Sequence, residues 1–317
     1  MKLRLACWAS DRVRPLADGR VSPEGLDLQV EHLPMEEMFA RMLRGQEFDA
    51  SEMSLSSYVV SLASGSCPFV AIPVFPSRMF RHSCLYVAAS GGVRRPEDLA
   101  GRRLGVPEYQ MTAGVWMRGT LEDEYGVAHD SVEYLTGGAE TPGRDEKIAL
   151  ELPSRIRVRN VGPGKTLVRM LLDGELDALQ VSRVPAALPG GGMRRLFEDF
   201  VGVERDYYRR TGIFPIMHVV VLRRELYERH RWIVRSLYDA FVRAKRLAQD
   251  ELSDTVALRS MLPWMLAELE WLRRESGGDW WPYGVEPNRR VLETFLRYHH
   301  SQGLSARLLG VDELFVA

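Results

Sequence analysis

The feature that most constrains the fold of this chain is a repeated alternation of short apolar strands with amphipathic helices over more than half of its length. Successive strand patterns are separated by helical stretches such as residues 36–44 and 111–125, where apolar side chains recur on one face. Alternating βα units predict a mostly parallel sheet with helices on its faces. The strand patterns cover residues 3–8, 26–33, 48–53, 69–74, 83–89, 102–106, 132–135, 156–161, 176–181 and 217–222.

The chain has 317 residues, which suits two compact domains better than one small core. Two strand-like segments, residues 83–89 and 217–222, join two sets of βα units. We therefore expect a two-lobed α/β protein with a ligand cleft between the lobes. Lobe 1 is predicted to be discontinuous, with C-terminal helices over residues 233–247, 256–272 and 289–299 folding back onto it. The predicted boundaries are 1–86 plus 221–317 for lobe 1 and 87–220 for lobe 2.

The composition excludes several classes of partner. A formal net charge of −1 gives no electrostatic basis for binding nucleic acid. No apolar run reaches about 18 residues, so no membrane span is expected. The N-terminus leads directly into a strand without a signal-peptide pattern, and the three cysteines have neither disulfide nor metal-site spacing. A cytoplasmic protein is expected, and the sequence leaves open whether it forms a homo-oligomer.

Five segments together resemble one family: residues 49–58 (DASEMSLSSY), 75–82 (FPSRMFRH), 105–113 (GVPEYQMTA), 210–218 (RTGIFPIMH) and 280–284 (WWPYG). In order and spacing they are similar to the 4,5-dihydroxyphthalate decarboxylases, and the likeness runs from residue 3 to residue 315. The resemblance implies the two-lobed fold of type II periplasmic binding proteins and a cytoplasmic location. It also implies loss of one carboxylate from a dihydroxylated phthalate, as a carboxy-lyase of aromatic degradation.

Candidate binding residues follow from the sheet topology, because ligands of open α/β sheets bind beyond the carboxyl ends of the strands. Serines crowd one strand-to-helix turn, and a similar polar turn precedes the helix over residues 111–125. Helix N-termini suit carboxylates, although ordinary N-capping explains such serines equally well. These loops supply the candidates Trp8, Ser54, Ser56, Tyr109, Gln110 and Thr112.

Residues 75–82 interleave cations with aromatic rings. Arginine can hold a carboxylate through two parallel hydrogen bonds, and aromatic side chains can flank a planar substrate. The alternative is a solvent-exposed hinge loop. We favour substrate binding by Arg78, Phe80 and Arg81. Further candidates are Arg183, Thr211 and Phe214.

His82 and His218 form the predicted acid–base pair, because only these two of the seven histidines lie in family-like segments at the lobe crossings. Histidine suits proton transfer near neutral pH. The alternative is that either side chain is structural. No metal-ligand spacing and no nucleotide- or cofactor-binding motif is present, so a reaction without cofactor or metal is expected.

Three functions remain open from the sequence. The first is an aromatic decarboxylase whose partner is a small aromatic carboxylate. The second is a solute-binding protein or sensor for an aromatic carboxylate, similar to the substrate-binding components of ABC transporters. The third is another cytoplasmic enzyme on the same fold.

Overall fold

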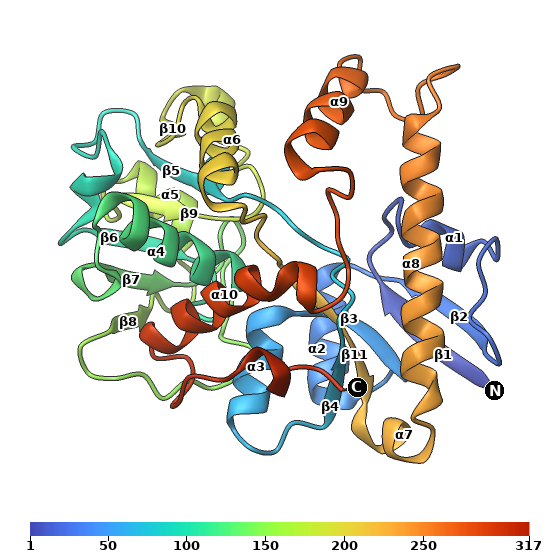
Figure 1. Ribbon diagram of the computed structural model, residues 1–317. Coiled ribbons are helices and arrows are strands. Elements are labelled where there is room, and N and C mark those ends of the chain that lie inside the picture. The colour runs from blue at the N-terminus through green and yellow to red at the C-terminus, as the bar shows by residue number, and fades with distance from the viewer. Residues whose placement is uncertain (317) are drawn as a thin grey trace.

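The computed structural model describes residues 1–316 and contains two mixed β-sheets, one in each lobe (Figure 1). The first sheet has the order β2-β1-β3-β11-β4, and the second has the order β10-β5-β9-β6-β7-β8. The two-lobed α/β architecture expected from the sequence is confirmed. The strands of the first sheet are β1 (Lys2–Cys7), β2 (Asp27–His32), β3 (Ala50–Ser54), β4 (Phe69–Ile72) and β11 (His218–Arg223). Those of the second are β5 (Leu85–Ala88), β6 (Arg103–Val106), β7 (Glu133–Thr136), β8 (Arg157–Asn160), β9 (Ala178–Gln180) and β10 (Met193–Arg195).

Strands β5 and β11 follow the two segments on which the chain passes between the lobes, and each runs against its neighbours. β11 is antiparallel to β3 and β4, and β5 is antiparallel to β9 and β10. Because β11 is reversed, its first residue lies at the edge where the parallel strand β3 ends, with His218 paired to Ser54. This reversal is what brings His218 to the ligand-binding edge of the sheet.

The helices flank the two sheets and partly bridge them (Figure 1). α8 packs on α1 beside the first sheet, whereas α10 packs on α4 of the second lobe. The helices are α1 (Arg14–Ala17), α2 (Met35–Gly45), α3 (Leu55–Ala63), α4 (Thr112–Tyr125), α5 (Leu167–Leu172), α6 (Phe200–Thr211), α7 (Arg224–Arg229), α8 (Trp232–Ser253), α9 (Met265–Ser276) and α10 (Arg289–Ser301). The C-terminal helices thus contact both lobes, and the predicted boundaries remain predictions.

A glycine allows the close approach of α10 to α4. A Cβ atom on Gly119 would lie 2.2 Å from the ring of Tyr298, so only glycine fits at this crossing. The contact is reinforced at its rim, where the Tyr298 hydroxyl donates a hydrogen bond of 2.6 Å to Asp123 and Arg297 forms an ion pair with the same carboxylate. The C-terminal segment is therefore fixed to the second lobe as well as to the first.

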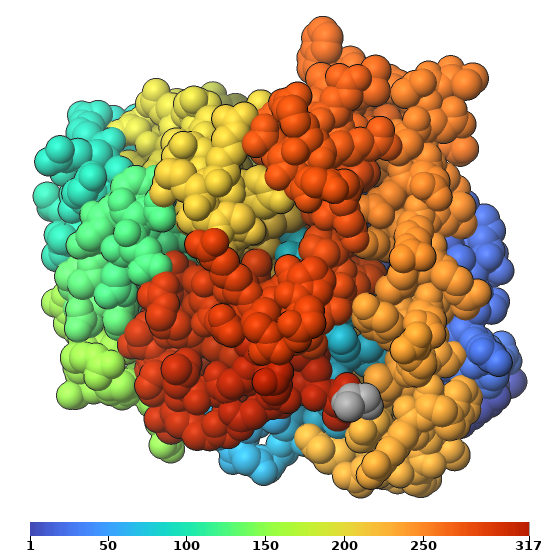
Figure 2. Space-filling model, in the orientation of Figure 1, coloured from blue at the N-terminus to red at the C-terminus, as the bar shows by residue number. Residues whose placement is uncertain are grey.

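The last helices differ from the sequence prediction. A helix was expected over residues 256–272, but α9 begins only at Met265. Pro263 has no backbone N–H and disfavours helical geometry in the residue before it, which accounts for the late start. The preceding segment exposes Val256, Met261 and Trp264, and α9 projects beyond the neighbouring surface in Figure 2. In the described part of the chain, no helix is both long enough and apolar enough to cross a membrane.

Candidate functional site

A cavity of about 300 Å³ lies between the lobes, within the size range of small-molecule sites. Its wall comes from the carboxyl ends of strands in both sheets, as the topology requires. A second cavity of about 360 Å³ shares Glu36, Met111, Arg144, Ser182 and Arg183 with the first, so the two form one continuous cleft. The first cavity is lined by Trp8, Met35, Glu36, Phe39, Ser54, Ser77, Met79, Arg81, Met111, Thr112, Ala113, Arg144, Lys147, Ser182, Arg183, Met217 and His218.

The chemical centre of this cleft is a histidine–glutamate pair. His218 Nδ1 lies 2.6 Å from Oε1 of Glu52, and the second oxygen of Glu52 accepts the backbone N–H of Trp8 at 3.0 Å. Glu52 and Ser54 share one face of β3, and His218 is registered opposite Ser54, so Glu52 and His218 are diagonal neighbours on that face. A carboxylate at Nδ1 fixes the tautomer and leaves Nε2 as the ring nitrogen for a ligand in the cleft.

Both members of the pair are almost completely buried, with Glu52 1% and His218 8% exposed. The ring of Phe39 packs edge-on against His218 at 5.0 Å between centroids. Burial, reinforced by the negative charge of Glu52, holds the pKa of the Cys7 thiol well above its usual range. Cys7 therefore stays protonated and is part of the core rather than a nucleophile.

The two polar strand-to-helix turns meet across the cleft. Ser54 Oγ lies 2.9 Å from Thr112 Oγ1, and the backbone N–H of Ser56 donates to that same Thr112 oxygen at 3.0 Å. Ser54 Oγ also accepts the N–H of Ser57. Protein groups thus already occupy the backbone N–H groups of Ser56 and Ser57 at the start of α3, which favours the N-capping alternative for this turn.

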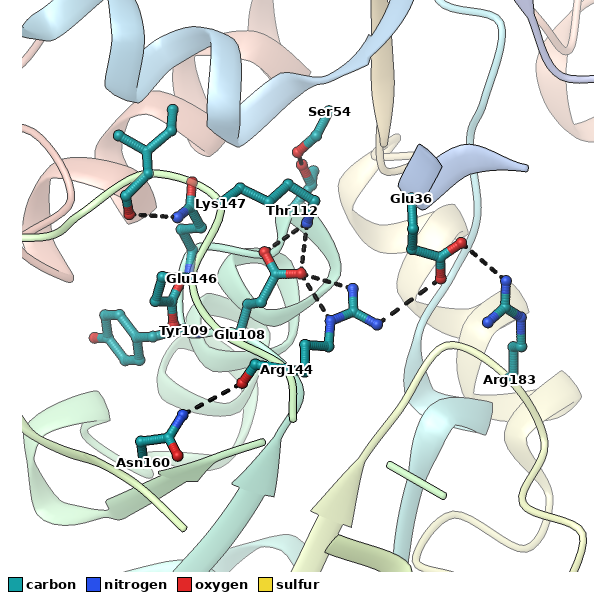
Figure 3. A network of polar contacts seen from close by, with 12 residues as sticks. Glu36, Ser54, Glu108, Tyr109, Thr112, Arg144, Glu146, Lys147, Asn160 and Arg183 are labelled. Carbon is teal, nitrogen blue, oxygen red and sulfur yellow. Dashed lines mark hydrogen bonds and ion pairs between the residues drawn. The ribbon is translucent and has the colours of Figure 1, made fainter. Parts of the chain in front are cut away.

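Four cationic side chains line the same cavity: Arg81, Arg144, Lys147 and Arg183. Arg144 and Lys147 are held by Glu108, which is 2% exposed. Its Oε1 accepts from Arg144 Nη2 at 2.6 Å and from Lys147 Nζ at 2.6 Å (Figure 3). Arg81 has softer partners, because its side chain donates to the sulfur atoms of Met217 and Cys84. Because sulfur is a weak hydrogen-bond acceptor, the guanidinium of Arg81 remains able to bind a carboxylate of a ligand.

Six of the sequence candidates line the cleft: Trp8, Ser54, Arg81, Thr112, Arg183 and His218. Arg78, in contrast, is buried and lies outside the lining of this cavity. Its two terminal nitrogens donate to the backbone carbonyls of Phe214 at 3.0 Å and Pro282 at 2.8 Å, and one also contacts Asn288. Burial lowers the pKa of Arg78 to about 9, as expected for a guanidinium removed from water.

His82, the other member of the predicted acid–base pair, also lies away from the cleft lining. Both ring nitrogens are buried, and Nδ1 lies 3.7 Å from Glu204. The ring packs against Phe197 at 5.1 Å and Tyr207 at 5.8 Å between centroids. His82 and His218 therefore do not face one site as a pair, because apolar packing holds His82 among residues of the second lobe.

The remaining candidates make internal contacts outside the cavity lining. Phe80 stacks on Phe214 at 4.8 Å, and the Thr211 hydroxyl donates to the carbonyl of Tyr207. Tyr109 donates through its hydroxyl to the carbonyl of Gln302, and the Gln110 side chain donates to the carbonyl of Ile148. Ser56 is fully buried in α3. Sequence reasoning missed Glu36, Glu52, Arg144 and Lys147, although Glu52 stands within the family-like segment 49–58.

Comparisons with known proteins identify the relatives of the chain. No family model matches it. A 4,5-dihydroxyphthalate decarboxylase of Comamonas testosteroni is 43% identical over 317 residues, covering 99% of this chain and 96% of that protein. One of Pseudomonas putida is 42% identical over 211 residues, covering 66% of this chain and 82% of that protein.

Solved structures bear on the fold alone, because their sequences are distant. The periplasmic aliphatic sulphonate-binding protein SsuA of Escherichia coli superposes with a TM-score of 0.55 at 13% identity, covering 100% of this chain and 92% of that one. A mutant of DszB in complex with biphenyl-2-sulfinic acid has a TM-score of 0.54 at 16% identity, covering 99% of this chain and 96% of that one. The fold is that of the periplasmic binding proteins, and by its identity to relatives along nearly its whole length the chain belongs to the 4,5-dihydroxyphthalate decarboxylase family.

Proposed function

We propose that the chain is a carboxy-lyase that removes one carboxylate of 4,5-dihydroxyphthalate as carbon dioxide and releases 3,4-dihydroxybenzoate, a step in the degradation of phthalates. The observation that carries the proposal is the buried His218–Glu52 pair at a cleft lined by four cations, in a chain of this family. The relatives' names favour an enzyme over a solute-binding protein.

The charge of the cleft suits the substrate. Four cations, Arg81, Arg144, Lys147 and Arg183, face one carboxylate of the lining, Glu36, and the buried carboxylate of Glu108 that holds two of them, which leaves an excess of two positive charges. A dianion gains from such an excess of cations, particularly where protein surrounds it and screening by water is reduced. Polarizable side chains in the same lining can pack on an aromatic ring, and these are Met35, Met79, Met111 and Met217.

The proposed chemistry is a proton transfer to a ring carbon. Nε2 of His218 carries a proton as the imidazolium, which the carboxylate of Glu52 stabilises through Nδ1. The hydroxyl para to the departing carboxylate pushes an electron pair into the ring, and the carbon that bears this carboxylate takes the proton. The carbon–carbon bond then breaks, its electron pair restores the aromatic ring, and carbon dioxide leaves. The neutral imidazole regains a proton from solvent.

Replacing each histidine tests the proposal. His218→Asn should lower turnover by about 10²–10⁴-fold, the usual contribution of a general acid or base, while phthalate binding changes little. His82→Asn is the matched control, since its ring nitrogens are buried outside the cleft lining. Near-normal turnover is expected for it. The reverse result would reinstate His82 as the proton carrier and overturn the role of His218.

We also place the enzyme in the cytoplasm. All three cysteines, Cys7, Cys67 and Cys84, are free and buried, as is usual for proteins kept in a reducing compartment. Fractionation of the native host tests this location, and activity recovered in the periplasmic fraction would contradict it.

A further inference from the structure

Glu36 is the carboxylate that reaches across the cleft. It stands in the first turn of α2 in the first lobe, and its Oε2 accepts from Arg183 Nη2 of the second lobe at 3.0 Å. Its Oε1 lies 3.8 Å from Arg144 Nη1. Figure 3 shows Glu36 between these two guanidinium groups, with Glu108 on the other side of Arg144. The two arginines therefore contact a carboxylate of the protein itself inside the cleft.

The two glutamates hold Arg144 very differently. Glu108 is buried and bonds Arg144 through Nε at 2.8 Å and Nη2 at 2.6 Å, which fixes the position of the guanidinium. Glu36 contacts Arg144 only at ion-pair distance, and its side chain is 42% exposed. A solvent-exposed, loosely held partner contributes little to stability and exchanges readily for another anion. Glu108 thus positions Arg144, whereas Glu36 is replaceable.

Glu36 also holds Arg183 in an exposed ion pair. The Arg183 side chain is 79% exposed, and Glu36 is its one charged partner among residues 1–316. Because Arg144 and Arg183 both line the cleft and both contact Glu36, displacing Glu36 would free the guanidinium of Arg183 and the Nη1 end of Arg144, while Glu108 still holds Arg144 in position.

We propose that Arg144 and Arg183 form a carboxylate subsite that Glu36 occupies as an internal carboxylate until one carboxylate of the ligand displaces it. The inference rests on the proposed function, because it assumes that an aromatic dicarboxylate enters this cleft. Glu36 then acts as a competitor built into the protein. Glu36 shields the two arginines from other anions. It lowers the affinity of the cleft for the dicarboxylate by the free energy of its own contacts with these arginines.

Removing the competitor should tighten binding. Glu36→Gln keeps the size of the side chain and removes its charge. It should bind phthalate, which has both carboxylates but no hydroxyl to react through, about three- to tenfold more tightly, as expected from losing two exposed ion pairs. The gain should shrink at high salt. Glu37→Gln is the matched control, because Glu37 is the next residue of α2 and pairs with Arg41 instead of facing the cleft.

A variant that lacks both arginines tests whether they cause the gain in phthalate affinity. In a chain carrying both Arg144→Gln and Arg183→Gln, the further change Glu36→Gln should increase phthalate affinity much less, because only the direct repulsion between Glu36 and the dianion is then removed. Affinity for catechol, which carries no carboxylate, should be unaffected by Glu36→Gln in either background. Isothermal titration calorimetry measures each value without requiring turnover.

Unchanged or weaker phthalate binding in Glu36→Gln would overturn the inference. Glu36 would then have only a structural role, as an ion-pair partner that connects the two lobes. An equal gain for catechol would also overturn the inference, by showing that the cleft merely opens. If neither the original chain nor any variant binds phthalate, the proposed function itself fails. That outcome is distinguishable from the others, because they all require phthalate to bind the original chain.

Discussion

Glu52→Gln isolates the charge behind the proposed proton carrier. The substitution keeps the shape of the side chain and one oxygen that can accept from His218 Nδ1, but it removes the negative charge that lies 2.6 Å from that nitrogen and the second oxygen that accepts from the Trp8 N–H. Both groups are almost completely buried, so solvent screens the interaction only slightly.

The magnitude follows from the type of hydrogen bond. A hydrogen bond to a charged group contributes about 1.5–3 kcal/mol, against about 0.5–1.5 kcal/mol for a neutral one. The difference of about 1–2 kcal/mol acts on the imidazolium that protonates the ring. Since about 1.36 kcal/mol corresponds to a tenfold change in rate, kcat should fall by roughly 5- to 30-fold.

Steady-state assays of 4,5-dihydroxyphthalate consumption measure this effect, with phthalate affinity as the check that the cleft is intact. Glu31→Gln is a suitable control, because Glu31 also pairs with a cation, Arg4, but does so in a partly exposed position. A Glu52→Gln variant whose kcat stays within about twofold of the original would refute the idea that Glu52 supports proton transfer.

Two further predictions concern binding and stability. Arg81→Met should raise KM for 4,5-dihydroxyphthalate by about tenfold or more, because charged hydrogen bonds to the substrate are lost and only sulfur contacts to protein are given up; an unchanged KM would remove Arg81 from the binding site. Asp123→Asn should destabilise the attachment of α10 by roughly 1 kcal/mol or less, since the pair with Arg297 is partly exposed. Burial opposes ionisation of Asp123, but Arg297 and Tyr298 outweigh it and lower the pKa of this carboxyl. The stabilisation is therefore present above the unfolded-state pKa of about 3.9 and is lost as the pH falls through the lower folded value. Urea denaturation should show the difference between the two proteins at neutral pH and its loss in strong acid, and a difference that grows in acid would contradict the assignment.

Local sequence patterns predicted most strands of the two sheets, but the edge strand β10 was not predicted. Trp8, Ser54, Thr112 and Arg183 each follow or end a strand, and the topology rule places such residues at the cleft. His218 is found there for a different reason, which is the reversed direction of β11. The direction of a crossing strand is set by long-range pairing that a linear pattern does not contain.

Arg78 and His82 lie outside the cleft lining for a common physical reason. Residues 75–82 are dense in arginines and aromatic rings, but sequence density does not reveal which side chains turn inward. Arg78 is held in the core by the carbonyls of Phe214 and Pro282, and His82 packs on Phe197.

The missed residues depend on contacts that are distant in sequence. Glu52 was missed because its partner is 166 residues away along the chain. Arg144 and Lys147 lie between β7 and β8 in a segment without periodicity, and only the contacts to Glu108 reveal their position.

The most direct test of the central claim is the fate of the proton in heavy water. The protein is incubated with 4,5-dihydroxyphthalate in D₂O, and the carbon dioxide and aromatic product are quantified and characterised by mass spectrometry and NMR. Protonation of the ring carbon that loses its carboxylate predicts one carbon dioxide per 3,4-dihydroxybenzoate, with one deuterium at the vacated ring position. Absence of carbon dioxide, or a product without deuterium at that position, would contradict the account.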